Sequence, residues 1–245
     1  TNSFNGTKIA QSDYNLEDYV RDININAVQA VKEAISETVD KVEGRKIFIA
    51  GAMGPTNRTA SMSPDVEDPG KRNVTFDQLA QAYYEQSKYL LEGGVDLFLP
   101  ETTFDTLNLK AAIFGLNTLF REIGFRLPVF LSVTFSDKSG RTLSGQTINA
   151  YWESIRHANP YAFGMNCGLG ASSLINYIET LSEIADTKIF CYPNAGLPNP
   201  LSDTGYDETP DMTSKEIKKF VDSSLLNFVG GCCGTTPDHI NAIKK

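Results

Sequence analysis

Short apolar runs alternate with helical segments along almost the whole chain, and this alternation constrains the fold more than any other feature. The runs are continuously apolar, as in strands that are buried on both faces of a sheet. Between them, apolar residues recur at the spacing of one helix face. A chain in which strands alternate with helices predicts a parallel sheet with crossover helices. We expect the strands at residues 46–52, 95–101, 129–135, 162–167, 188–192 and 225–229.

The number of strands suggests a barrel. Thr1–Gly6 is too short for a full strand and resembles the end of one. Six strands and this remnant fit a (β/α)8 TIM-type barrel that lacks its first strand and most of its second. A doubly wound open sheet is the alternative, but its nucleotide-binding Gly-x-Gly-x-x-Gly turn follows none of the early strands. We therefore predict an α/β fold, with one N-terminally truncated barrel domain over residues 1–245.

One long segment interrupts the regular alternation. Residues 54–73 are rich in Pro, Ser, Thr, Asn and Asp and have no periodicity. A loop of this length in a compact domain is usually functional or disordered. Directly after it, Thr75 and Gln78 form a capping-box pattern that predicts the start of a helix. An earlier helix is expected over residues 16–42, ending near Gly44.

Charge and composition exclude several classes of partner. The formal net charge is -8 and no cluster of Lys and Arg is present, which argues against a nucleic-acid partner. No apolar run is long enough to span a bilayer, so we expect no membrane partner. Four cysteines are too few for a disulfide scaffold of this length. We therefore predict a cytoplasmic location.

Two adjacent cysteines, Cys232 and Cys233, lie in a glycine-rich turn between an apolar strand and a helix start. Neighbouring side chains of an extended strand point to opposite faces, so only a sharp turn directs both sulfurs to one point. The following helix N-terminus is expected to lower a thiol pKa. Cys167 occupies the same position at the end of another strand. Three thiols at one edge of a parallel sheet predict a zinc site.

Other assignments of the cysteines remain open at this point. Free cysteines are often packing residues, and a vicinal disulfide between Cys232 and Cys233 would make a redox switch.

Polar residues also follow the ends of the predicted strands, where barrel active sites are built. They are Glu101, Thr134, Asn166 and Asn194.

With these residues established, the chain resembles the homocysteine-binding zinc domain of the cobalamin-dependent methionine synthase family. The cysteine set is shared by homocysteine S-methyltransferases in general, whereas the loop from Gly54 and the Asn-Ala-Gly-Leu-Pro turn indicate the cobalamin-dependent branch. The resemblance covers essentially the whole chain. The motifs that carry it are Gly54–Ala60, Ser63–Val66, Glu101–Thr102, Phe104–Asn108, Gly140–Thr147, Asn166–Gly168, Tyr192–Pro198 and Gly230–Ile240.

This resemblance implies roles for particular residues. Zn2+ is bound by Cys167, Cys232 and Cys233, with Asn194 as a fourth ligand that the substrate sulfur displaces. Glu101 binds the amino group of L-homocysteine, and Asn166 and Asn194 belong to the substrate-binding set. The resemblance assigns no role to the remaining cysteine or to the histidines. We expect Cys191 to be a buried thiol, and His157 and His239 to be surface or helix-capping residues.

The implied activity is that of a methyltransferase in methionine biosynthesis. Zinc deprotonates the homocysteine thiol, and the thiolate accepts a methyl group from methylcobalamin to give methionine. The cobalamin-binding and folate-binding domains of the full enzyme are the implied partners, and neither is in this chain. Alternatives are a betaine- or S-methylmethionine-dependent homocysteine S-methyltransferase and, outside catalysis, a thiol redox or zinc-binding module.

The chain departs from the family pattern at one position. The family's first barrel strand carries an Asp-Gly-Ala-Met-Gly-Thr turn that helps to hold homocysteine, and no segment before Thr1 supplies it. Ala50–Gly54 is similar in sequence but lies in the context of the third strand, so the role is not transferred. The expectation is therefore an incomplete barrel, for which both an active and an inactive chain stay open.

Overall fold

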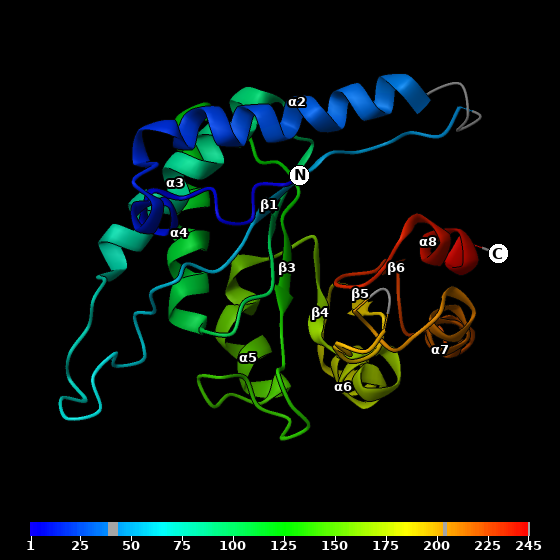
Figure 1. Cartoon of the computed structure of the whole chain (residues 1–245). Coiled ribbons are helices and arrows are strands. Elements are labelled where there is room, and N and C mark those ends of the chain that lie inside the picture. Colours follow the sequence, from blue (N-terminus) through cyan, green and yellow to red (C-terminus); the bar gives the residue numbers. More distant parts are fainter. Residues whose placement is uncertain (39–43, 203–204, 245) are drawn as a thin grey trace. The chain divides into compact units, whose positions relative to one another are not determined.

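The computed structural model describes residues 1–38, 44–202 and 205–244. It forms two compact units, Thr1–Phe130 and Leu131–Lys245, coloured blue to green and green to red in Figure 1. The first contains a two-stranded sheet of β1 and β2, and the second a four-stranded sheet in the order β3-β4-β5-β6. The six predicted strands and an α/β fold with parallel strands are confirmed. Closure of the strands into a barrel and truncation of its start stay predictions.

The first unit packs helices against a short parallel sheet. Helices α3 and α4 lie side by side (Figure 1), and they approach closely at Gly115, where an added Cβ would lie 2.8 Å from the backbone oxygen of Ala80. Strands β1 and β2 pair in parallel from Ala50 opposite Leu97. The elements are α1 (Lys8–Gln11), η1 (Ser12–Tyr14), η2 (Glu17–Tyr19), α2 (Val20–Thr38), β1 (Ala50–Met53), α3 (Phe76–Gly93), β2 (Leu97–Pro100) and α4 (Thr106–Ile123).

The first residues of the chain run beside β1. The amino group of Thr1 donates to the backbone oxygen of Ala50 at 2.9 Å, and the Ser3 hydroxyl donates to that of Ala52 at 2.7 Å. The prediction that Thr1–Gly6 is the end of a strand is wrong, because this segment pairs with β1 through its amino group and side chains and contains a turn rather than a strand.

Two boundaries differ from the sequence prediction. Strand β1 begins at Ala50 rather than at residue 46, because Ile47 and Phe48 are 40% and 65% exposed and do not enter the sheet. Helix α2 begins at Val20, after two 3-10 turns that the helical spacing did not indicate. Its predicted end near Gly44 falls partly on residues 39–43, which lie outside the described part of the chain.

The long loop over residues 54–73 is irregular, as predicted, and its first part is held by buried polar groups at the start of α4. The buried Asp105 carboxylate caps α4 and accepts the backbone N–H of Ser61 at 3.2 Å. The buried Asn108 accepts the N–H of Ala60 at 2.9 Å. The bond to Asn108 satisfies the buried backbone N–H of Ala60, and the bond to Asp105 holds the more exposed Ser61, so this part of the loop is a built feature of the unit.

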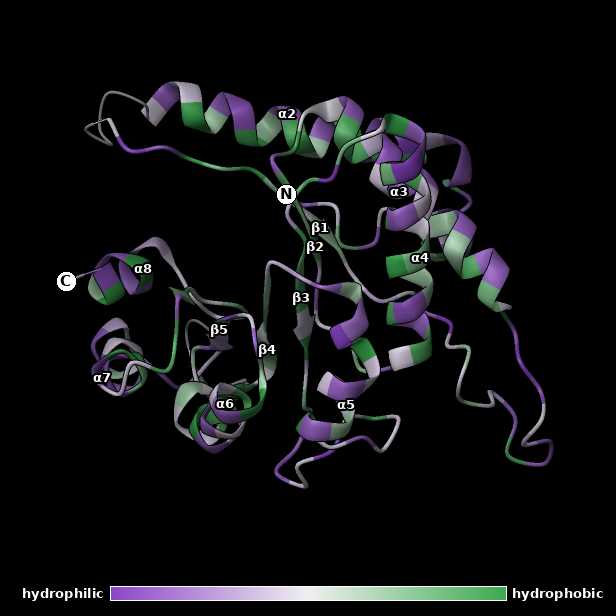
Figure 2. Ribbon diagram, turned by 180° about the vertical axis from the view of Figure 1, so that it is seen from behind, coloured by the Kyte–Doolittle hydropathy of each residue, from purple (hydrophilic) through white to green (hydrophobic). Residues whose placement is uncertain are grey.

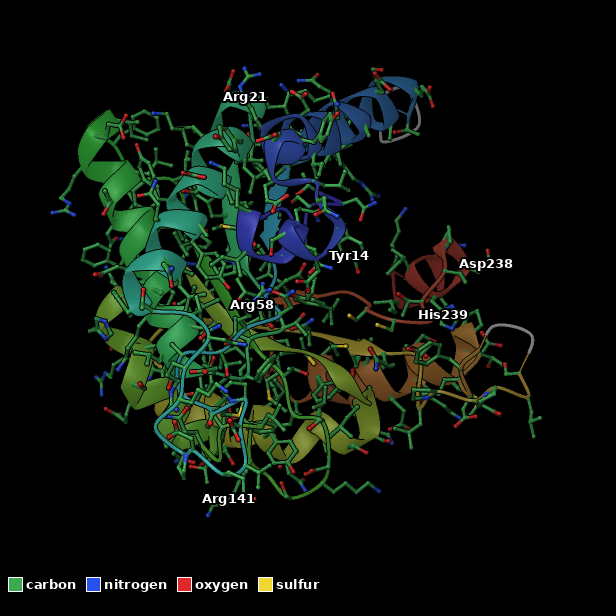
Figure 3. The ribbon with its side chains drawn as sticks, turned by 60° about the vertical axis from the view of Figure 1, so that its left-hand side comes forward. Tyr14, Arg21, Arg58, Arg141, Asp238 and His239 are labelled. Carbon is green, nitrogen blue, oxygen red and sulfur yellow. The ribbon has the colours of Figure 1, made fainter. Side chains whose placement is uncertain are left out.

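Arg58 ties the same loop to the N-terminal helices. Its guanidinium donates to the backbone oxygen of Ile9 and forms an ion pair with Asp13, each at 2.8 Å. Figure 3 shows Arg58 and the nearby Tyr14 in this region. The Thr75 capping box predicted after the loop is confirmed, with both of its hydrogen bonds formed.

The second unit continues the alternation of strand and helix. Strands β4, β5 and β6 pair in parallel and in chain order. Their carboxyl ends therefore lie at one edge of the sheet, where the cysteines were expected. The elements are β3 (Phe130–Val133), α5 (Ile148–Ile155), η4 (Arg156–Ala158), β4 (Ala162–Gly170), α6 (Ala171–Ile184), β5 (Lys188–Asn194), α7 (Pro210–Asp222), β6 (Phe228–Val229) and α8 (Pro237–Lys244).

The core of this unit is built from aromatic and aliphatic side chains between the sheet and its helices. Trp152 of α5 stacks on Phe163 of β4 with ring centroids 5.3 Å apart. Helix α7 buries Ile217 and Phe220 and exposes its charged residues, and Figure 2 shows the two kinds of residue around it. Among the described residues, no helix combines the length and the apolar character needed to cross a bilayer.

Candidate metal centre

The end of β4 presents two neighbouring side chains to the same site. In a regular strand, Asn166 and Cys167 would point to opposite faces. Here the backbone enters the left-handed region, with φ of 58° at Cys167 and 68° at Gly168. The pairing with β5 shifts register between Asn166 and Gly170. This irregularity redirects Cys167, so that both residues reach the cluster described below.

The second contribution comes from the turn that follows β6. The Thr235 N–H and hydroxyl donate to the Cys232 backbone oxygen at 3.2 and 2.6 Å, which closes a tight turn. Gly234 has a φ of 78°, a conformation that favours glycine at this position. The Cys233 backbone oxygen accepts the N–H of Ala195 at 2.9 Å, which fastens the turn to the end of β5. The predicted role of glycine in this turn is thus confirmed at Gly234.

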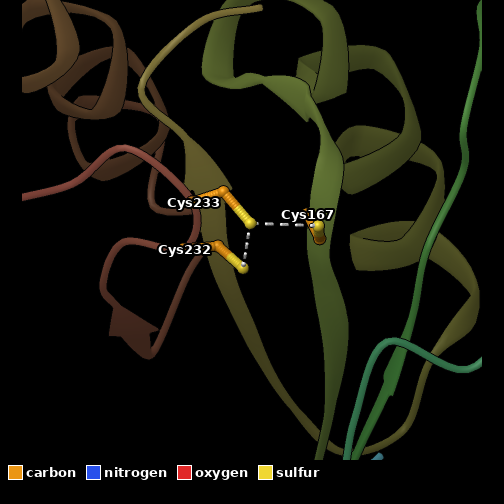
Figure 4. A group of neighbouring side chains, drawn as sticks. All are labelled: Cys167, Cys232 and Cys233. Atoms are coloured by element: carbon orange, nitrogen blue, oxygen red, sulfur yellow. Dashed lines mark hydrogen bonds between the residues drawn. The ribbon is translucent and has the colours of Figure 1, made fainter. Parts of the chain in front are cut away.

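Together these segments collect three sulfur atoms (Figure 4). The sulfur of Cys233 lies 3.7 Å from that of Cys167 and 3.9 Å from that of Cys232, and all three lie within 4.8 Å of one another. Zn–S bonds of about 2.3 Å at tetrahedral angles place ligand sulfurs about 3.8 Å apart. The three thiols therefore fit zinc. They are free, and no other cluster of three potential His, Cys, Asp or Glu ligands occurs among the described residues.

The three thiols have different proton affinities. Hydrogen bonds, foremost from Cys232, lower the pKa of Cys167 to about 6. The hydrogen bond to Cys167 and burial raise the pKa of Cys232, and burial and the charge of Cys167 raise that of Cys233. The expectation that the helix N-terminus lowers the pKa of a thiol in the turn is therefore wrong for the metal-free cluster, because the hydrogen bond to Cys167 raises the pKa of Cys232 and burial raises that of Cys233. A divalent cation would replace the protons that Cys232 and Cys233 retain.

Two buried asparagines contact the cluster. Asn166 accepts a hydrogen bond from the Ser132 hydroxyl and donates its amide N–H to the Cys232 sulfur at 3.7 Å. Asn194 accepts the backbone N–H of Cys233 on its Oδ1 atom at 3.1 Å, and its side chain hydrogen-bonds Cys167 and lowers the pKa of that thiol. Both predicted residues thus lie at the site. Their roles toward substrate, and that of Asn194 as a metal ligand, stay predictions.

Glu101 belongs to the other unit. It follows β2, is half-buried, and donates its backbone N–H to the Met53 oxygen at 3.0 Å. Its predicted contact with the homocysteine amino group stays a prediction. Cys191 is buried inside β5, outside the cluster, and burial raises its pKa to about 12. The prediction of a buried thiol is confirmed there.

His239, labelled in Figure 3, is buried rather than at the surface, and its predicted capping role is confirmed. It is 3% exposed, and its Nδ1 atom accepts the N–H of Thr236 at 3.2 Å at the start of α8. Its Nε2 atom lies 3.1 Å from the backbone oxygen of Glu208 and donates to it, since Nδ1 acts as the acceptor. Sequence reasoning missed this link and also missed Tyr206, which hydrogen-bonds Cys233. His239 lies in the same motif as Cys232 and Cys233, but the motif does not indicate its bond to Glu208, and Tyr206 lies outside every motif named above.

Comparisons with known proteins show which family the chain belongs to. The family model described as homocysteine S-methyltransferase matches residues 1–245. Similar solved structures include the metallated and oxidized forms of the homocysteine methyltransferase MmuM from Escherichia coli. Their sequence identities are 19% and 17%, and their TM-scores 0.76 and 0.77. Each match covers 100% of this chain and 77% of the other.

A GH113 beta-1,4-mannanase is also similar, with 12% identity, a TM-score of 0.51, and coverage of 91% of this chain and 78% of the other. At such identities these structures show a likeness of fold alone. The family assignment follows from the match over the full chain. The chain belongs to the homocysteine S-methyltransferase family.

Proposed function

We propose that this chain binds L-homocysteine through its thiol at a zinc ion held by Cys167, Cys232 and Cys233, and prepares the sulfur to accept a methyl group. The observation that carries the proposal is the spacing of the three sulfurs, 3.7 and 3.9 Å around Cys233. Zinc bound there would act as a Lewis acid that binds the substrate sulfur and lowers the pKa of its thiol.

Different residues of the chain hold the metal, position its ligands and leave room for the substrate. Three thiolates and a divalent cation give a net charge of about -1, so a bound substrate sulfur keeps much of its electron density. Asn166 fixes the position of Cys232 by a hydrogen bond to its sulfur. Cys233 is exposed, whereas Cys167 and Cys232 are half-buried, so the cluster is accessible to substrate beside Cys233. Glu101 is the proposed partner of the substrate amino group.

For the methyl donor we propose methylcobalamin bound by another domain of a longer enzyme. In the transfer, the homocysteine sulfur attacks the methyl carbon, the new S–C bond forms, and the bond from carbon to the donor breaks. Methionine is the product. The sequence motifs of the loop from Gly54 and of the turn Asn194–Pro198 support this donor. The protein would act in the cytoplasm as a domain of a methionine synthase.

A small methyl donor is the second candidate. The likeness to MmuM, whose name describes a homocysteine methyltransferase, favours this alternative. Betaine or S-methylmethionine would then deliver the methyl group directly. The two candidates share the zinc site and differ only in the donor.

The proposal is tested first by binding and then by transfer. Calorimetry with the zinc-loaded chain should detect homocysteine but not homoserine, which replaces the thiol by a hydroxyl. Methionine formation is then measured with methylcobalamin, betaine and S-methylmethionine in parallel. Equal binding of homoserine would contradict sulfur recognition at zinc, and transfer from a small donor without cobalamin would decide for the second candidate.

A further inference from the structure

Tyr206 lies against the cysteine turn although it is far from it in the chain. It belongs to the loop that follows β5, where it pairs with Pro198 in an antiparallel bridge. The next residues fasten this loop, since the N–H of Asp207 donates to the Leu197 oxygen at 3.2 Å and that of Glu208 to the Ala195 oxygen at 3.0 Å. Because Ala195 also bonds the Cys233 oxygen, the loop and the cysteine turn are joined at their bases.

The side chain of Tyr206 contacts the turn at two points. A Cβ added to Gly234 would lie 2.3 Å from the Tyr206 Cγ atom, so the ring packs directly on the glycine backbone. The phenol hydroxyl donates a hydrogen bond to the sulfur of Cys233. The absence of a side chain at Gly234 is therefore what permits the ring to approach Cys233.

With Tyr206 included, each sulfur has one asparagine or tyrosine side chain that donates a hydrogen bond to it, in addition to the contacts among the thiols. Asn166 donates to the sulfur of Cys232, Asn194 to that of Cys167, and Tyr206 to that of Cys233. The two asparagines are buried and act on half-buried sulfurs, whereas the half-buried tyrosine acts on the exposed sulfur.

We propose that Tyr206 is a positioning residue that keeps the metal-bound Cys233 thiolate from reacting with the methyl donor in place of the substrate. This inference rests on the proposed zinc function. A zinc-bound thiolate is itself a nucleophile, and Cys233 is the sulfur that an incoming electrophile reaches most easily. Its attack would form an S–CH3 bond on the cysteine, break the bond to the donor, and leave a neutral thioether in place of the thiolate that zinc sites use. The hydroxyl bond draws electron density from the sulfur and slows this reaction.

The test uses Tyr206→Phe, which keeps the ring on Gly234 and removes only the hydroxyl. The matched control is Tyr161→Phe, because Tyr161 precedes β4, lies over the Lys188 ammonium at 4.1 Å, and is at the opposite end of that strand from Cys167. Each zinc-loaded full chain is treated with methyl iodide, and methylation of each cysteine is followed by peptide mass spectrometry. Zinc per chain is measured in the same samples.

We expect Cys233 of Tyr206→Phe to be methylated about three to ten times faster than Cys233 of the unmodified chain, as loss of one hydrogen bond of ordinary strength predicts. Zinc content and the rates at Cys167 and Cys232 should stay unchanged, and Tyr161→Phe should behave like the unmodified chain. If the hydroxyl only held the structure together, Tyr206→Phe would instead have a lower zinc content and all three of its sulfurs would be exposed. We expect that result for Tyr206→Ala, which removes the ring as well.

The possible failures are distinguishable. Equal Cys233 rates with and without the hydroxyl, at full zinc content, would overturn the role of Tyr206 and leave the zinc function intact. Loss of zinc in Tyr206→Phe would also overturn it and would mark the phenol as part of the metal-holding structure. Absence of zinc from the unmodified chain would overturn both proposals together.

Discussion

The sulfur atoms of Cys167 and Cys233 lie 3.7 Å apart, although 66 residues separate them in the chain. This separation is too long for a disulfide, whose S–S bond is about 2.05 Å, and matches two ligands of one tetrahedral zinc ion. The left-handed backbone at Cys167 contributes to it by turning the side chain out of the regular strand direction. Such strain, of about 1–3 kcal/mol, is tolerated where surrounding structure and function require it.

Replacing a cluster cysteine should remove the metal. The unmodified chain should hold about one zinc ion, and Cys167→Ser or Cys232→Ser less than about a tenth of that, because two thiolates no longer complete the site. Elemental analysis of the purified chains measures this. Cys191→Ala is the control, since Cys191 is buried outside the cluster, and it should retain zinc. Full zinc content in Cys167→Ser would contradict the three-thiolate site.

Zinc affinity should depend steeply on pH. The pKa of Cys167 is lowered to about 6, so this thiol has lost its proton at neutral pH. Cys232 and Cys233 keep their protons, because their pKa values are raised. Binding then displaces about two protons, and the apparent association constant should fall about 100-fold for each unit that the pH falls between about 8 and 6.5. Competition with a chelator of known proton affinity measures the slope. A slope near zero would show that the site is already deprotonated.

Gly168→Ala should destabilise the fold strongly. A Cβ at this position would lie 2.0 Å from the Phe135 backbone oxygen, and the φ of 68° disfavours any side chain. We expect a loss of about 3 kcal/mol or more in the free energy of unfolding, measured by urea denaturation. Gly145→Ala separates the two causes, because Gly145 has a φ of 89° but open space around it, and should lose only about 1 kcal/mol. Equal losses would show that the close approach at Gly168 is unimportant.

His239→Leu should loosen the cysteine turn from its neighbours. It leaves the Thr236 N–H and the Glu208 oxygen without their imidazole partner, at a cost of about 2–4 kcal/mol in unfolding free energy. Zinc should also dissociate faster, as stopped-flow chelation can measure. Asp238→Asn, on the adjacent residue in the first turn of α8, should cost less than about 1 kcal/mol. An unchanged zinc off-rate in His239→Leu would show that the link does not support the site.

Asp105→Ala should release the loop before α3. The carboxylate caps α4 and holds Ser61, so we expect a loss of about 3 kcal/mol and rapid proteolysis within residues 54–73. Thr75→Ala removes a cap without touching that buried network and should cost about 1 kcal/mol. Unchanged proteolysis of Asp105→Ala would mean that other contacts hold the loop.

The alternation of strands and helices could be read from the sequence because burial imposes a local pattern on each segment. The same reasoning placed Cys167 and the Cys232–Cys233 turn at the strand ends, since parallel strands share one edge. It placed the start of β1 too early, because Ile47 and Phe48 are apolar but remain exposed. Burial of such a run depends on neighbours that its own sequence does not specify.

The class of fold, the three thiols and the family follow from the sequence, because they depend on residue types and on spacing along the chain. The lowered pKa of Cys167, the hydrogen bonds of Asn166 and Asn194, and the contact of Tyr206 with Cys233 follow from the folded structure alone. Proton affinity and hydrogen bonding depend on distances of a few ångströms between segments that are remote in the chain. Those distances are fixed by packing, and no local pattern in the sequence encodes them.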